Sequence, residues 1–221
     1  MAAQSSNYRT YSPAEWWSDA AIHGLGIVAA LVAVPVLITL AAFWSGNAVI
    51  VTAASIYGAC LLTLLIASAG NSMVASPVWR EPLRRIDRAA IYVTIAGTYT
   101  PLAVLSGGQF GLVLTAIWGA ALAGVSMVVV SPDRTKWLAL ALYLGLGWAG
   151  AIIGGPLGAE LSPAGLALIL TGGGLYTLGV CFFLWRQLPF HNTIWHLLVL
   201  AASFVFYAAI LVELADRAAA I

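Results

Sequence analysis

Seven apolar runs follow one another along this chain, and prolines, glycines and charged residues separate them. Each run has roughly 19 to 27 residues, long enough for a helix to cross about 30 Å of hydrocarbon at 1.5 Å per residue. The alternation typical of a transmembrane β-strand is absent from the runs. The pattern therefore predicts an all-α integral membrane protein, a seven-transmembrane-helix bundle. The expected spans are 20–43, 48–74, 87–106, 109–130, 136–154, 163–184 and 192–214.

Composition agrees with a membrane protein. The 221 residues are 62% hydrophobic and 8% charged, whereas about 25% of the residues in an ordinary globular chain are charged. A soluble domain of this size cannot hide so much apolar surface. The net charge of +1 gives no reason to expect nucleic acid. Membrane lipids are the partners that we expect.

The start of the chain is polar and lacks the pattern of a signal peptide. The run Ser12-Pro13-Ala14-Glu15 matches a capping box with proline at the first helical position. A helix is therefore expected to begin before the membrane. The expected organisation is a cytoplasmic segment with an interfacial helix start (1–19), a seven-helix transmembrane domain (20–214) and a C-terminal tail (215–221).

The basic residues predict an orientation. If the spans are drawn as above, eight of the nine basic residues fall on one side, and only Arg217 falls on the other. Because cytoplasmic loops carry an excess of Lys and Arg, the N-terminus is expected in the cytoplasm and the C-terminus outside. Insertion without a signal peptide suits a multi-pass protein of the cell membrane, here the bacterial inner membrane. The eight residues on the predicted cytoplasmic side are Arg9, Arg80, Arg84, Arg85, Arg88, Arg134, Lys136 and Arg186.

Five polar residues fall near the predicted cytoplasmic face. They are His23, Asn71, Asp87, Asn192 and His196. Asp87 is the only acid that these span limits place in the cytoplasmic third of the spans, and an acid there marks a functional site or a buried pairing. Asn192 and His196 are four residues apart, so their side chains share a helix face. Since buried polar groups need partners, the five are expected to converge, either as a reactive site or as a satisfied hydrogen-bond network.

Longer motifs carry a resemblance to a known family. They include the sequence AGTYTP at 96–101 and the sequence IWH at 194–196. With the stretches 14–26, 83–87, 141–148 and 173–179, the chain resembles the hemolysin III branch of the progestin and adipoQ receptor (PAQR) family, related to the adiponectin receptors. The resemblance implies seven helices with a cytoplasmic N-terminus, which agrees with the distribution of basic residues.

The resemblance also implies a zinc site, but one with changed ligands. Family members typically hold zinc near the cytoplasmic face with three histidines, accompanied by a serine and an aspartate. Asp87 and His196 match the family pattern, whereas two histidine positions fall on Asn71 and Asn192 and the serine position falls on Ala67. An amide oxygen is a poor zinc ligand. A degenerate site is therefore expected, with no cofactor, and with His196 as the metal ligand if zinc does bind.

Two functions follow from this interpretation. The first is a non-catalytic role in lipid binding or membrane homeostasis. The alternative is a metal-dependent lipid amide hydrolase, similar to a ceramidase, in which Asp87 would position or deprotonate a water and His196 would hold the ion. A transporter is only weakly indicated. A retinal-binding pump is excluded because it needs a lysine deep in the last span, and the only lysine here is Lys136.

Overall fold

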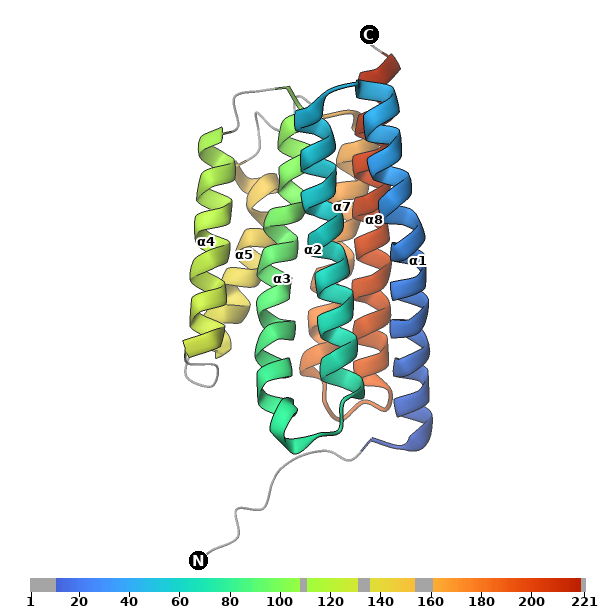
Figure 1. The fold of residues 1–221 in the computed structure, drawn as a ribbon. Helices are drawn as coiled ribbons and strands as arrows, with labels where there is room; N and C mark the ends of the chain where they lie inside the picture. The colour runs from blue at the N-terminus through green and yellow to red at the C-terminus, as the bar shows by residue number, and fades with distance from the viewer. Residues whose placement is uncertain (1–10, 108–110, 131–135, 154–160, 220–221) are drawn as a thin grey trace, which may run out of the picture.

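A computed structural model describes residues 11–107, 111–130, 136–153 and 161–219, and their regular structure is entirely α-helical. Within these ranges, seven helices form one elongated bundle (Figure 1). They are α1 (Pro13–Ser45), α2 (Ala48–Met73), α3 (Pro77–Leu105), α4 (Gly111–Val130), α5 (Lys136–Ile153), α7 (Pro163–Leu184) and α8 (His191–Ala219).

The helices pack side by side along the length of the bundle. Helix α8 packs against α7 and α1, and α2 packs against α1 and α3, while α4 and α5 lie on the far side of α3 (Figure 1). Helix α1 begins at the end of the bundle drawn lowest in Figure 1, where α2 ends and α3 and α8 begin. We call this end the lower end. Helix α8 ends at the opposite end, so the start of α1 and the end of α8 lie at opposite ends of the bundle.

The observed helices confirm the predicted fold class. Five of them are long and apolar enough to cross a membrane, counted over the described residues. The predicted span 87–106 is part of a longer helix, α3, which begins at Pro77. Its charged first turns stay helical because Glu81 accepts hydrogen bonds from Arg84 and Arg85 one turn later. The bond from Arg85 and the charge of both arginines lower the pKa of the Glu81 carboxyl.

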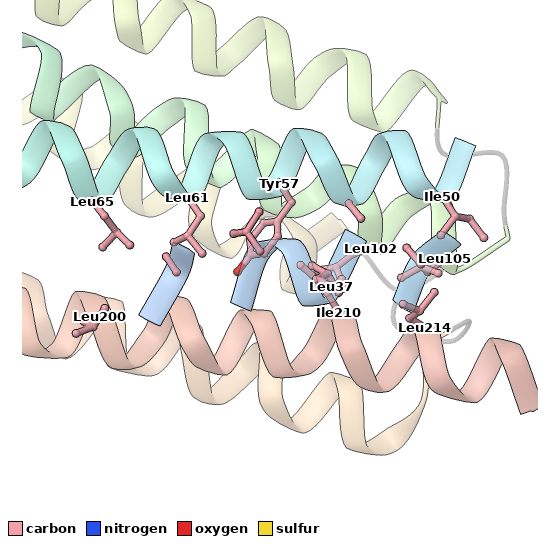
Figure 2. Close-up of a cluster of buried hydrophobic side chains, with 14 residues drawn as sticks. Leu37, Ile50, Tyr57, Leu61, Leu65, Leu102, Leu105, Leu200, Ile210 and Leu214 are labelled. Carbon is pink, nitrogen blue, oxygen red and sulfur yellow. The ribbon is translucent and has the colours of Figure 1, made fainter. Parts of the chain in front are cut away.

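A continuous apolar core holds α1, α2, α3 and α8 together (Figure 2). Tyr57, Leu61 and Leu37 are almost completely buried, and they meet Leu102 from α3 and Ile210 from α8. The Tyr57 hydroxyl donates to the carbonyl of Ser203, 3.2 Å away, so this polar atom is satisfied inside the core. The four helices are therefore fixed relative to one another, and this fixes what their lower ends bring together.

Close helix contacts depend on glycine at specific positions. A Cβ added to Gly124 of α4 would lie 2.4 Å from Cε1 of Tyr92 on α3. Tyr92 is buried, and its hydroxyl donates to the carbonyl of Ala139. The ring is therefore held from both sides and cannot easily move aside. Gly119, on the same helix, has open space where its Cβ would be.

These contacts predict opposite effects for two glycine substitutions in α4. We expect Gly124→Ala to lower stability by about 1–3 kcal/mol, as overpacking of a core does. Gly119→Ala is expected to leave stability unchanged or raise it by up to about 1 kcal/mol, because alanine favours helix more than glycine does. Thermal unfolding of the two variants in detergent checks this. Equal stability of the two variants would contradict the α3–α4 packing.

Candidate functional site

Helix α1 carries two polar residues into the lower end of the bundle. Its start is set by the predicted capping box, in which the Ser12 hydroxyl accepts from the Glu15 amide and the Glu15 carboxylate accepts from the Ser12 amide. Because the helix starts this early, Asp19 and His23 lie one turn apart on the same face. Both are 5% exposed. Asp19 lies one residue before the span predicted from the sequence, and for this reason it was missed.

Helix α8 begins next to α1, and the two are tied together. The Glu15 carboxylate, besides its capping role, accepts a hydrogen bond of 2.9 Å from the amide of Phe190, just before α8. The hydroxyls of Ser18 and Thr193 are 3.0 Å apart. These bonds set how α8 is turned about its axis, and Asn192 and His196 consequently face α1.

Asp19 is the centre of the contacts between α1 and α8. Its Oδ1 lies 2.6 Å from Nδ1 of His196, and its Oδ2 accepts a hydrogen bond of 3.1 Å from the Asn192 amide. The Asn192 amide is also 3.4 Å from Nδ1 of His196. A hydrogen-bond network inferred from the sequence alone pairs Asp87 with His196 or with a neighbouring arginine. The carboxylate bonded to His196 is instead that of Asp19.

His23 completes this group. Its Nε2 lies 3.6 Å from Oδ2 of Asp19 and 3.2 Å from the Ser72 hydroxyl on α2. The rings of His23 and His196 are in contact, with centroids 4.4 Å apart. Two imidazoles and one carboxylate from α1 and α8 thus share one small buried volume.

Asp87 belongs to a second group, on the α2 and α3 side. The Asn71 amide donates to its Oδ2 across 2.9 Å. Ser68 links this group to the first, because its hydroxyl is 3.4 Å from Nε2 of His196 and also interacts with the Asp87 carboxylate. All five residues proposed from the sequence therefore lie at the lower end. They form two groups that meet at Ser68 and His196.

Two serines of α2 contact the histidines of the cluster. Ala67, where the sequence analysis placed the family's serine, is a buried residue of an apolar cluster. Ser68 contacts His196, and Ser72, four residues later, contacts His23. Ser68 and Ser72 therefore offer a second correspondence with the family's serine and histidine positions, beside the one drawn from the sequence. Asn71 is a hydrogen-bond partner of Asp87.

Three residues could hold a metal ion. Asp19, His23 and His196 each offer a ligand atom, and these atoms lie within 4.8 Å of one another; no other such group occurs among the described residues. Two imidazoles and one carboxylate form a donor set that catalytic zinc sites use, with a fourth position left for water or substrate. Donors of a tetrahedral zinc are roughly 3.3 Å apart, given bonds of about 2.0–2.1 Å. Zinc binding would therefore break the 2.6 Å hydrogen bond between Asp19 and His196, and both side chains would bind the ion instead. With this small shift, the residues fit the metal that the family resemblance implies.

A large cavity leads away from this cluster. Its volume is about 710 Å³, within the range of pockets that bind small ligands. Ser68, Asp87 and His196 line its lower part, and its upper walls are largely apolar and aromatic. Along α3 the lining extends from Arg84 to Leu102, which is roughly 27 Å at 1.5 Å per residue. The cavity therefore follows most of the thickness of a bilayer core.

The fold and the site define a multi-helix membrane protein with a polar, metal-compatible cluster at one end of a long cavity. The family model for haemolysin-III related proteins matches residues 15–207. The chain belongs to this family. It is 36% identical over 196 residues to the hemolysin-3 homolog of Bacillus subtilis, covering 88% of this chain and 92% of that protein. It is 34% identical over 198 residues to hemolysin-3 of Bacillus cereus, covering 88% of this chain and 89% of the relative.

A more distant relative comes from animals. The chain is 32% identical over 166 residues to the human monocyte to macrophage differentiation factor, covering 70% of this chain and 67% of that protein. Together these matches confirm the resemblance to the hemolysin III branch of the PAQR family. The apolar helices and the Bacillus relatives agree with a multi-pass protein of the bacterial inner membrane.

Proposed function

We propose that this haemolysin-III family protein binds the acyl chain of a membrane lipid in its cavity, with the polar group of the lipid next to Ser68, Asp87 and His196. The observation that supports this most directly is the joining of one long cavity to one polar cluster. Apolar walls suit a hydrocarbon chain, and a few convergent polar groups suit its head. Because the cavity is long for its volume, a single extended chain fits better than a compact ligand.

Blocking the cavity tests lipid binding. Gly147 lines the cavity, and a Cβ added there meets nothing within 4 Å. We expect Gly147→Phe to fill part of the cavity and to reduce several-fold the lipid that co-purifies with the protein, measured by mass spectrometry after solvent extraction. The matched control is Gly119→Phe, which also points into open space but does not line the cavity. Equal lipid content in the two variants would contradict the proposal.

A second candidate is a metal-dependent hydrolase of a lipid amide or ester. It is supported by the group of Asp19, His23 and His196, in which Asp19 and His23 join the one metal ligand predicted from the sequence, His196. When bound there, zinc would supply a water of lowered pKa. Asp87 and His196 both line the cavity, and Asp87 accepts a hydrogen bond from Asn71. These contacts support a role for the Asp87 carboxylate in holding a water or accepting a substrate proton.

Metal content and chelation separate the two candidates. Stoichiometric zinc in the purified protein, with release of fatty acid from a ceramide that stops on chelation and in Asp87→Ala, would favour the hydrolase. Lipid binding that persists after complete removal of metal, without any release of fatty acid, would favour the non-catalytic role. Elemental analysis and a fatty-acid release assay on the same preparation provide both measurements.

A further inference from the structure

Three arginines line the lower mouth of the cavity. Arg84 and Arg88 lie one turn apart on α3, and Arg186 comes from the segment between α7 and α8. The cavity is therefore flanked by positive charge from two separate parts of the chain. Among the described lining residues Asp87 is the only one with a carboxylate, and it already accepts a hydrogen bond from Asn71. Glu81, which is not among the lining residues, binds Arg84 and Arg85. With Glu81 and Asp87 both counted, the arginines still give the described part of the mouth more positive than negative charge.

Not every arginine at the lower end of the bundle lines the cavity. Arg85 is next to Arg84 in sequence but does not line the cavity. Its Nη1 donates to the carbonyl of Val129 on α4, 2.8 Å away, and its Nε donates to Glu81. The positive-inside rule explains why arginines occur at this end. It does not explain why Arg84, Arg88 and Arg186 surround one opening while Arg85 faces another helix.

We propose that this mouth selects an anionic head group, so that the ligand of the cavity is a single-chain amphiphile carrying a carboxylate or a phosphate. Guanidinium groups bind both anions with paired hydrogen bonds. Next to apolar walls, such charged contacts are stronger than in water. The chain of the ligand would extend upward between the apolar residues, and its head would remain among the arginines. This inference rests on the proposed lipid binding and adds the charge of the ligand to it.

Competition between amphiphiles of identical chain tests the charge. The full-length protein is placed in nanodiscs of phosphatidylcholine, with empty nanodiscs as the baseline. Bound radiolabelled oleate is then displaced by oleate, by oleoyl lysophosphatidate or by oleyl alcohol. At least one anion should compete at a concentration at least about tenfold below that of the alcohol, as one charge-assisted contact would give. Comparing oleate with lysophosphatidate shows whether the carboxylate or the phosphate fits better.

Substitutions assign the preference to the arginines at the mouth. In the double variant Arg88→Gln and Arg186→Gln, the preference for anions is expected to disappear while the alcohol competes as before. The matched control is Arg85→Gln, which removes an arginine of the same helix that does not line the cavity and should keep the preference. Replacing Arg88 and Arg186 by lysine should restore part of it, because the charge returns without the paired geometry.

The outcomes distinguish this inference from the proposed function. Equal competition by alcohol and anions, or the same loss in Arg85→Gln as in the double variant, would overturn the selection of an anionic head and leave acyl-chain binding intact. If neither the alcohol nor the anions displace label above the empty-nanodisc baseline, lipid binding in the cavity is wrong, and the inference falls with it.

Discussion

Asp19→Ala is expected to lower the affinity for zinc at least about a hundredfold. Loss of a residue that only hydrogen-bonds to a metal ligand already costs up to about a hundredfold, and loss of a ligand itself should cost at least as much. Asp19 is the only carboxylate in the group of possible ligands, and its loss leaves two imidazoles. It also removes the contacts of Asp19 with His196 and Asn192. Because buried polar atoms left without partners cost about 1–3 kcal/mol, a lower unfolding temperature should accompany the loss of zinc. Titration calorimetry and thermal unfolding measure the two effects.

A matched substitution separates these effects from a general loss of charge. Asp216 is an exposed acid near the far end of α8. Asp216→Ala should leave both the zinc affinity and the unfolding temperature unchanged. If Asp19→Ala binds zinc as tightly as the wild-type protein, then Asp19 is not a ligand. The cluster would then be a hydrogen-bond network alone.

Ser72→His combined with Asn192→His is expected to raise zinc affinity by at least about tenfold. Ser72 contacts His23, and Asn192 contacts both Asp19 and His196. Histidines at these positions would add imidazole donors, which zinc prefers to amides and hydroxyls. Zinc titration against a chromophoric chelator measures the gain.

A second double variant tests which residue of α2, Ser72 or Asn71, corresponds to the histidine position of the family. Asn71→His with Asn192→His introduces the same two imidazoles, but one of them replaces the residue that donates to Asp87. We expect a smaller gain in zinc affinity from it than from the pair containing Ser72. If the variant with Asn71→His binds zinc more tightly, then the correspondence first drawn from the sequence is right and the one drawn from Ser68 and Ser72 is wrong.

Several features of this protein could be predicted from its sequence because they depend on local properties of the chain. Hydropathy and length are sufficient to find the helices, since a membrane-crossing segment must satisfy its own backbone hydrogen bonds. The capping box at Ser12 and Glu15 predicted where α1 begins, to the residue. Helix α3 begins ten residues before the predicted span 87–106. Hydropathy does not reveal this extension, because its turns are charged and contain Pro82, and ion pairs within the helix help to stabilise them.

The same local information could have pointed to Asp19. It lies four residues before His23, on a helix whose start was known from the cap, so the pair shares one face. Hydropathy placed the edge of the span after it, and for that reason it was treated as part of the solvated segment. The helix in fact continues through this edge, and the side chain is buried.

The sequence by itself determined the membrane class, the helical fold, the family and the gathering of polar residues at one end. Only the tertiary structure decided which carboxylate meets which imidazole. Asp19 and His196 are 177 positions apart, and their contact depends on how far α1 and α8 are turned about their axes. That rotation is set by bonds between distant residues, such as Glu15 with the Phe190 amide. No pattern within a single helix encodes such a rotation, because it is a property of the packed bundle.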